Sequence, residues 1–229
     1  VWCSVFRYET KTTKLFLRTR EFLWQEGHTV HATREEADVE VRQQLDTYKD
    51  LCETLLAIPV IQGLKTDRER FAGALTTTSI EAIMPDGKAL QMGTSHNLGQ
   101  NFSKAFGIKF IDKDEKEKFA WQTSWGVSTR LIGALIMVHG DDKGLVLPPK
   151  LAETKAVVVP ILFEDSKKKV LAASRKIAEK LSKDIAVHFD DRENYSAGWK
   201  FNEWELVGIP LRIELGPKDI EKKQAVVVR

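Results

Sequence analysis

The sequence predicts an α+β protein in two parts: an antiparallel sheet with helices over residues 1–153, then a small α/β domain over residues 154–229. In the first part, strand-like runs are separated by turn signals such as Pro85-Asp86-Gly87. In the second part, the uninterrupted apolar run at residues 156–163 is typical of a strand buried in a parallel sheet. Between them, the composition changes over residues 150–155, where we place the boundary.

The composition is that of a globular protein of one or two domains. The chain has 229 residues, of which 42% are hydrophobic and 30% charged, and its net charge is +2. This charge neither requires nor excludes a nucleic-acid partner. Cys3 and Cys52 match no disulfide framework or zinc-ligand spacing, which favours a reduced, cytoplasmic setting. No apolar run approaches the roughly 20 residues that span a bilayer, and no signal peptide is visible, so we expect no membrane association.

The N-terminal third predicts a hairpin followed by a long helix. Residues 1–7 alternate as in a strand, and residues 15–19 are expected to pair back on them. Thr33 and Glu36 have the spacing of a capping box, so a helix begins there and ends before Pro59. Its expected apolar face has members three or four residues apart: Ala37, Val41, Leu45, Tyr48, Cys52 and Leu55.

The rest of the first part predicts four strands and a buried helix. Strands are expected at residues 76–84 and 88–93 on either side of the turn, and at residues 119–124. A largely apolar helix is expected at residues 127–139, ended by Gly140, with a short strand at residues 145–147.

The second part predicts a βαβ unit. A basic amphipathic helix is expected at residues 166–183, with Val170, Ala173, Ile177 and Leu181 on one face, and strands at residues 185–189 and 211–215. Pro217 is expected to open a short helical turn. Residues 1–7 begin with alternating apolar residues and no initiator Met, and residues 225–229 are typical of a strand that nothing follows, so we expect the chain to be a fragment of a larger polypeptide.

The first cluster with chemical potential lies on the N-terminal hairpin. It contains Arg7, Glu9, Arg18, Arg20, Glu21 and Glu26. One interpretation is a solvated sheet face with weak ion pairs. The other is a floor for an anionic ligand, because arginine grips phosphate with two parallel hydrogen bonds and keeps its charge when partly buried.

Two further clusters follow along the chain. Gln91, Thr94, Ser95, His96 and Asn97 lie at a strand end before Gly99, where small polar groups suit a ligand, although a lone histidine is more often simply packed. Arg130 begins an apolar helix after Trp125, Gly126 and Ser128, so it requires a carboxylate partner or a ligand phosphate. No P-loop or Rossmann glycine fingerprint is present.

In this order, the three clusters resemble the motifs of class II aminoacyl-tRNA synthetases. Arg7-Tyr8-Glu9 with residues 17–22 resembles motif 2, and residues 126–130 resemble motif 3. Longer strings resemble prolyl-tRNA synthetases of the archaeal and eukaryotic type: FLRTREFLWQEGH at residues 16–28, GTSHNLGQNF at 93–102 and HGDDKGLVLPP at 139–149. The similarity continues through residues 194–201 and 214–217, so it covers essentially the whole chain.

The resemblance implies a role for individual residues. Arg7 and Arg130 would be catalytic, and ATP would be bound by Arg7, Glu9, Arg18, Thr19, Gln91, Thr94, Ser128 and Arg130. Proline would be bound by Arg7, Trp24, Glu26, His96, Phe102, Trp125 and Gly126, with Mg²⁺ near Gln91. The second part resembles an anticodon-binding domain, in which Arg212, Glu214 and Lys218 are candidates for reading bases. Lys167, Lys168 and Lys169 fit a solvated helix face better than a specific tRNA contact.

The resemblance also implies the activity of the whole protein. It would activate L-proline with ATP to prolyl-adenylate, transfer it to tRNA(Pro), and work as a cytoplasmic homodimer. Residues 35–90 are filled by one helix and a hairpin, so we expect no editing domain there. Motif 1, an upstream Thr-x-Glu segment and a C-terminal zinc-binding extension are expected in the family but are missing from this sequence.

Two other functions remain open at this point. The chain could be a non-catalytic synthetase-like module that binds tRNA or a partner, or part of a synthetase for threonine or histidine. Arg7, Arg18 and Arg130 favour the catalytic interpretation over the first. The strings around His96 and Trp125 favour proline over the second.

Overall fold

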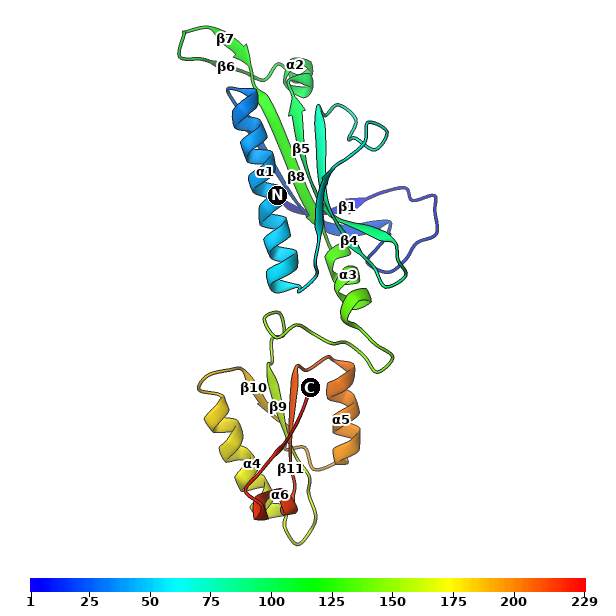
Figure 1. Cartoon of the computed structure of the whole chain (residues 1–229), viewed down its shortest axis with the longest axis vertical. Helices are drawn as coiled ribbons and strands as arrows, with labels where there is room; N and C mark the ends of the chain where they lie inside the picture. Colours follow the sequence, from blue (N-terminus) through cyan, green and yellow to red (C-terminus); the bar gives the residue numbers. More distant parts are fainter. The chain divides into compact units, whose positions relative to one another are not determined.

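The computed structural model describes all residues, 1–229, as two compact units, Val1–Val138 and His139–Arg229 (Figure 1). We call them unit 1 and unit 2 and describe each separately. None of the helices is both long enough and apolar enough to cross a lipid bilayer.

Unit 1 is built on a six-stranded antiparallel sheet with strand order β1-β2-β8-β5-β4-β3. The strands are β1 (Trp2–Phe6), β2 (Glu21–His31), β3 (Ile61–Leu64), β4 (Thr76–Ile83), β5 (Ala89–Gly99) and β8 (Trp121–Ser128). Helix α2 (Asn101–Phe106) and a separate hairpin of β6 (Lys109–Ile111) and β7 (Glu117–Phe119) connect β5 to β8. The predicted antiparallel sheet is confirmed, while α2 and the β6–β7 hairpin were not predicted.

Helix α1 (Arg34–Asp50) covers one face of this sheet (Figure 1). The predicted capping box is confirmed, because the Glu36 backbone N–H donates to Thr33 Oγ1 at 3.2 Å and the Glu36 carboxylate accepts from the Thr33 N–H. The predicted apolar face is buried as far as Cys52, but Leu55 is exposed and Leu56 is buried instead. A π-helical turn, η1 (Leu51–Leu55), adds a residue to the turn and so shifts the buried position.

The predicted strand at residues 15–19 is wrong. Those residues form a tight turn closed by a bridge between Lys14 and Arg18, with Phe16 in a left-handed conformation (φ 58°), and β1 pairs with β2 instead. This turn is held in place by packing against a segment distant in the sequence. A Cβ placed on Gly133 would lie 2.7 Å from Leu17 Cδ2, which shows how closely the turn packs on helix α3 (Arg130–His139). Tertiary packing therefore overrides the local strand pattern.

Helix α3 begins later than predicted and is less buried. Strand β8 continues through Ser128, so Val127 and Ser128 extend the sheet and Arg130 is the first helical residue. Within α3, Gly133, Ala134 and Leu135 are buried, whereas Ile132 and Ile136 are exposed. The prediction of a wholly buried helix is therefore wrong.

Unit 2 is a four-stranded sheet with order β10-β9-β11-β12 and helices on both faces (Figure 1). Its elements are β9 (Ala156–Pro160), α4 (Lys167–Leu181), β10 (Val187–Phe189), α5 (Ala197–Leu206), β11 (Leu211–Leu215), α6 (Pro217–Glu221) and β12 (Val226–Val228). The predicted βαβ unit is confirmed, because β9 pairs in parallel with both β10 and β11 and all five of its residues are buried. Helix α5 was not predicted.

The short strand predicted at residues 145–147 is absent. The backbone there docks on the end of α5 instead: Leu145 N–H donates to Leu206 O at 3.2 Å and Leu147 N–H to Gly208 O at 3.4 Å. Gly144 makes this approach possible, since a Cβ there would lie 2.5 Å from Leu206 Cα.

A buried ionic network lies beside α5. Asp190, whose side chain is fully buried, follows β10 and accepts hydrogen bonds from Arg192 at 2.8 and 2.9 Å and from Trp204 Nε1 at 2.9 Å. The ammonium of Lys200, 1% exposed, lies 3.5 Å from the same carboxylate and donates to the Asp190 carbonyl at 3.0 Å. Because lone buried charges are strongly destabilising, each member depends on the others.

Candidate functional site

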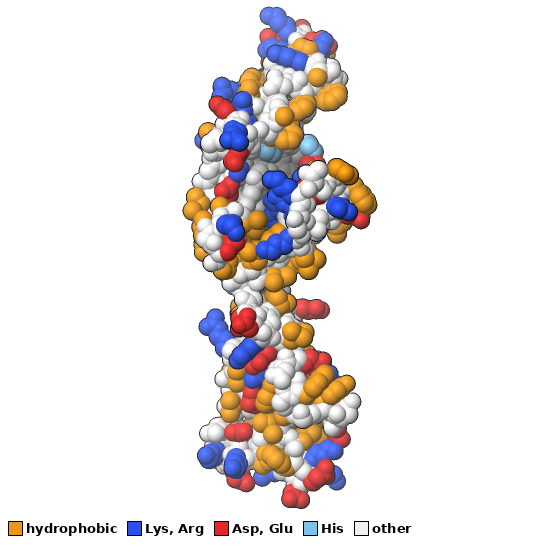
Figure 2. All heavy atoms as spheres, turned by 90° about the vertical axis from the view of Figure 1, so that its right-hand side faces the viewer, with side chains coloured by type: hydrophobic (Ala, Val, Ile, Leu, Met, Phe, Trp, Pro, Cys, Tyr) orange, Lys and Arg blue, Asp and Glu red, His pale blue; other side chains and the backbone are white.

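A cavity of about 720 Å³ lies in unit 1, on the sheet face opposite α1. Figure 2 shows basic side chains and histidine in the hollowed face of this unit. Since directly paired residues of an antiparallel sheet point to the same side, the register places the floor of the cavity in rows. The rows are Trp24 with Ser128; Glu26 with Gly126 and Thr94; and His28 with Ser124 and His96.

Three arginines converge at one end of this cavity. Arg7 follows β1 and lies against the rings of Phe22 and Trp24 at 5.1 and 5.7 Å. Arg130, the first residue of α3, donates from Nε to Leu17 O at 3.2 Å and from a terminal nitrogen to Gln91 O at 3.5 Å. Burial, followed by the positive charges of Arg18 and Arg7, lowers the pKa of the Arg130 guanidinium. Neither Arg7 nor Arg130 has a carboxylate partner, so this end lacks a counter-charge that an anion would supply.

Arg18 is the one member of this group that is neutralised. Its guanidinium lies 3.2 Å from Glu9 Oε1, and a hydrogen bond from the Lys11 N–H, together with Arg18, lowers the pKa of Glu9. Thr19, one residue further along the turn, also lines the cavity. The N-terminal cluster therefore contains both features that the sequence left open: an ion pair at Arg18, and an unpaired cation at Arg7.

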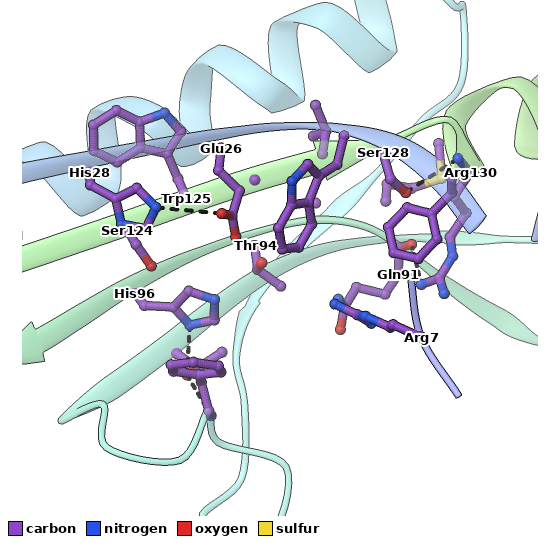
Figure 3. A pocket seen from close by; sticks show the side chains of 18 of the residues that line it. Arg7, Glu26, His28, Gln91, Thr94, His96, Ser124, Trp125, Ser128 and Arg130 are labelled. Atoms are coloured by element: carbon purple, nitrogen blue, oxygen red, sulfur yellow. Dashed lines mark hydrogen bonds and ion pairs between the residues drawn. The ribbon is translucent and has the colours of Figure 1, made fainter. Parts of the chain in front are cut away.

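Ser128 and Gln91 lie beside the arginines (Figure 3). The Arg130 backbone N–H donates to Ser128 Oγ at 3.3 Å. Gln91 pairs across strands with Glu81, whose carboxylate is held by Lys65 and by Ser79 at 3.3 Å. Residues 1–229 contain no group of three or more His, Cys, Asp or Glu side chains that could hold a metal. The Gln91 amide oxygen is a donor that a hard cation accepts, and no cage of protein ligands surrounds it.

The opposite end of the cavity has no arginine. Glu26 lies 3.5 Å from His28 Nε2, and Thr94 faces it from β5. Gly126 lies between them, and a Cβ there would lie 3.1 Å from the Gln25 carbonyl oxygen and 3.5 Å from Glu26 Cγ. Glycine at this position therefore leaves the floor open beneath the Glu26 carboxylate.

His96 forms the end wall together with residues that the sequence did not indicate. Its Nδ1 lies 2.9 Å from Thr77 Oγ1, and its ring packs against Phe71 at 5.1 Å between centroids. Phe71 in turn lies 6.5 Å from the ring of Phe102. Burial lowers the pKa of His96 to about 4, so the ring is uncharged at neutral pH.

The side chains of three residues that we expected at the cavity point to the other face of the sheet: Ser95, Asn97 and Trp125. Trp125 lines the cavity, but strand alternation turns its indole to the α1 side, where a Cβ on Gly27 would lie 2.2 Å from the ring. Figure 3 shows the indole of Trp125 apart from His96 and Thr94. Asn97 donates to Asp38 of α1 at 2.7 Å, and Ser95 is also buried on that side. Trp24 does face the cavity, and its Nε1 donates to Cys3 Sγ at 3.0 Å.

The cavity also contains residues that the sequence did not single out. Phe22, His28, Phe71, Thr77 and Ser124 line it alongside the predicted residues. For Phe22, His28 and Ser124, alternation with the predicted Trp24, Glu26 and Gly126 was an available signal. Phe71 carried no local signal, because the loop before β4 brings it to His96, whereas Thr77 meets His96 through the β4–β5 register.

The three base-reading candidates lie in unit 2. Arg212 on β11 is buried, pairs with Glu205 at 3.0 Å and with Glu214 at 2.9 Å, and lies 4.4 Å above the ring of Phe201. Lys218 lies on α6 and is exposed. The structure thus joins Arg212 and Glu214 and leaves Lys218 separate from them.

Comparisons with known proteins agree with this arrangement. A family model described as "tRNA synthetase class II core domain (G, H, P, S and T)" matches residues 1–139, and one described as "Anticodon binding domain" matches residues 155–229. Similar curated proteins named "Proline--tRNA ligase" come from Natranaerobius thermophilus, Agathobacter rectalis and Alkaliphilus oremlandii, which are bacteria.

These three relatives are 59%, 60% and 56% identical to this chain over 228 residues. The match covers 100% of the chain and 47% of each relative, so the chain spans about half the length of the curated relatives it matches. The class II core model alone covers residues 1–139, more than half of the chain, and includes every residue of the cavity. The chain belongs to the class II aminoacyl-tRNA synthetase family, with a class II core followed by an anticodon-binding domain.

Proposed function

We propose that this chain belongs to a proline–tRNA ligase, which activates L-proline with ATP to prolyl-adenylate and transfers the prolyl group to tRNA(Pro). The observation that carries the proposal is the convergence of Arg7, Arg18 and Arg130 from separate segments on one cavity, two of them without a carboxylate partner. The similarity to curated proteins of that name supports the choice of proline.

The arginine end of the cavity is suited to the triphosphate. Activation is an attack by the proline carboxylate on the α-phosphorus, with pyrophosphate as the leaving group, so two anions must meet and charge builds on phosphoryl oxygens. Arg7 would hold the carboxylate against the α-phosphate, and Arg130 the γ-phosphate. Fixed cations lower the free energy of such a transition state, and binding both substrates in line supplies the rest, so no side-chain nucleophile is required.

The end of the cavity opposite the arginines is suited to proline. The Glu26 carboxylate offers a counter-charge to the substrate amine, and uncharged His96 adds no competing positive charge beside it. Phe102 and Phe71 close the wall around the ring. Such a wall rejects a ligand that differs by one methylene by only about 1–3 kcal/mol, so alanine and cysteine are the expected misactivated amino acids.

Several finer assignments belong to the same proposal. Mg²⁺ would accompany ATP near Gln91, and Glu9 and Thr19 would contact the nucleotide. We further propose that the full-length protein is a cytoplasmic homodimer, that the domain boundary lies between residues 153 and 154, and that the enzyme is of the archaeal and eukaryotic type. The last rests on the strings at residues 16–28, 93–102 and 139–149.

The experiment that tests the proposal is proline-dependent ATP–pyrophosphate exchange by the full-length protein. We expect exchange with proline, weak exchange with alanine, and none with threonine or histidine. Absence of exchange with proline would overturn the enzyme assignment and favour a non-catalytic tRNA-binding module. Exchange with threonine or histidine in its place would reassign the substrate.

Arg212→Gln is expected to separate the two half-reactions. The resemblance makes Arg212 a candidate for reading an anticodon base, and it lies in unit 2 whereas the cavity lies in unit 1, so its loss should weaken tRNA binding while leaving amino-acid activation intact. A lost base contact is typically equivalent to about 10- to 100-fold in affinity, and we expect KM for tRNA(Pro) to rise by that factor. The measurement is aminoacylation against pyrophosphate exchange in the same preparation, with the exposed Lys176→Gln as a control. An unchanged KM for tRNA would remove Arg212 from the anticodon site.

A further inference from the structure

A chain of two hydrogen bonds links His96 to the loop before β4. The Phe71 backbone N–H donates to Thr77 Oγ1 at 3.0 Å, and the same oxygen lies 2.9 Å from His96 Nδ1. Thr77 is 3% exposed, so water does not replace either partner. Thr77 sits directly opposite His96 in the β4–β5 pairing, which fixes the contact through the sheet register.

The direction of these hydrogen bonds determines where the histidine proton lies. The Phe71 N–H can only donate, so Thr77 Oγ1 accepts there. The oxygen has a second lone pair, but His96 Nδ1 is the only other partner of this buried hydroxyl, so the hydroxyl proton enters a hydrogen bond only if it is given to Nδ1. A neutral imidazole that accepts on Nδ1 carries its proton on Nε2. Figure 3 shows the hydrogen-bonded nitrogen turned away from Glu26 and Thr94. We propose that Thr77 is a positioning residue that holds His96 as the neutral tautomer with its proton on Nε2, the nitrogen that faces the cavity.

The surroundings of His96 fit an uncharged ring. The elements packed around it contribute Thr77 from β4, Phe71 and Glu69 from the loop, Phe102 from α2, Ser124 from β8, and His28 with Glu26 from β2. The remaining ionisable groups of the cavity are Arg7, Glu9, Arg18 and Arg130. Arg7 and Arg130 lie at its other end, and Arg18, which pairs with Glu9, is close enough to Arg130 to lower its pKa. Burial keeps the imidazole neutral at working pH, as its lowered pKa of about 4 indicates.

This arrangement makes His96 a fixed, uncharged N–H group at the end of the cavity opposite the arginines. A cationic ring in this place would repel a ligand amine, and the neutral ring does not. The aromatic contact with Phe71 at 5.1 Å limits rotation of the ring, so Thr77 and Phe71 together fix its orientation. Loss of the Thr77 hydroxyl should therefore affect the group bound at this end and not the group bound by the arginines.

The first test reads the tautomer directly, by ¹⁵N nuclear magnetic resonance of the 229-residue chain labelled at histidine. The chain has five histidines, and His96→Gln assigns the signal. We expect a protonated Nε2 and an unprotonated Nδ1 for His96 in the wild type and in Thr77→Ser, and a mixture of tautomers in Thr77→Val. A wild-type signal with the proton on Nδ1, or an unchanged signal in Thr77→Val, would overturn the proposal.

The matched control is Thr78→Val. Thr78 is the next residue of β4, faces the opposite side of the sheet, and donates to Ser95 O at 2.8 Å. Thr78→Val also removes one threonine hydroxyl from β4, so this variant reports any general effect of valine in that strand. We expect the His96 tautomer to be unchanged in this variant.

The second test is kinetic and rests on the proposed activation of proline. In the full-length protein, Thr77→Val should raise KM for proline about tenfold, because His96 is no longer held in one orientation and one tautomer beside the bound amino acid, with KM for ATP and kcat within about twofold of the wild type. Thr77→Ser should restore the wild-type KM. Equal losses in both KM values, or no recovery with serine, would show a merely structural role for Thr77. If the wild type itself shows no proline-dependent exchange, the proposed function fails, and the tautomer measurement still decides the role of Thr77.

Discussion

Arg130→Ala is expected to reduce proline-dependent ATP–pyrophosphate exchange by about 100- to 1,000-fold or more, while the fold stays intact. Removal of one preorganised group that stabilises transition-state charge typically has this effect. The fold should survive because Arg130 has only the carbonyls of Leu17 and Gln91 as partners. Its positive charge also repels Arg7 and Arg18, so the free energy of unfolding of the variant should be equal to or slightly above that of the wild type.

The measurement combines exchange kinetics with urea unfolding of the full-length protein. Arg20→Ala is the matched control, because Arg20 is exposed in the same N-terminal segment and does not line the cavity. It should retain near wild-type exchange. Wild-type exchange in Arg130→Ala would remove this residue from the phosphate site, and an equal loss in Arg20→Ala would show that the assay reports overall charge.

Asp190→Ala is expected to lower the free energy of unfolding of unit 2 by about 3–5 kcal/mol, because it leaves the buried Lys200 ammonium without its carboxylate. It also removes the acceptor for Trp204 and one of two carboxylates that hold Arg192. The measurement is urea unfolding followed by tryptophan fluorescence, since Trp204 reports on this site. Asp191→Ala is the control: its exposed pair with Arg175 at 3.0 Å should contribute less than about 1 kcal/mol. Equal effects of the two substitutions would contradict the buried network.

The same network predicts a pH dependence. Burial opposes ionisation of Asp190, but hydrogen bonds from Arg192 and Trp204 and the charge of Lys200 outweigh it, so its pKa lies well below the usual range. A carboxyl group with a depressed native pKa contributes its full stability above the unfolded pKa, about 3.9, and loses it as pH falls further. The difference in unfolding free energy between wild type and Asp190→Ala should therefore be constant above about pH 5 and shrink below about pH 4. A difference that grows on acidification would contradict this sign.

Local signals in the sequence predicted the elements that depend on neighbours in the chain. The capping box at Thr33 and Glu36, the turn at Pro85, and the apolar run of β9 all correspond to observed features. The prediction of a strand at residues 15–19 was wrong because Leu17 packs on Gly133, more than 100 positions away. Contacts of this kind leave no trace in a short window of sequence.

In the candidate site, too, some residues were recognisable from the sequence and others were not. The arginines were recognisable because an arginine at the start of an apolar helix, or on a strand, requires a partner. Strand parity turned out to matter more than composition: Thr94 and His96 face the cavity, while Ser95, Asn97 and the indole of Trp125 face α1. Parity could have been assigned only once one anchor, such as the contact between Asn97 and Asp38, was known.

The pleat of the sheet places the side chains on the floor of the cavity at regular intervals. Side chains on one face recur every second residue, so neighbouring side chains in the series Trp24, Glu26 and His28 lie about 7 Å apart. When the anionic end of a ligand lies among the arginines, the spacing of the strand fixes which side chain its other end meets. A molecule lengthened by a single bond would fit these positions less well, at a cost of about 1–3 kcal/mol. The spacing of the strand therefore adds a modest selection by length to the selection by charge.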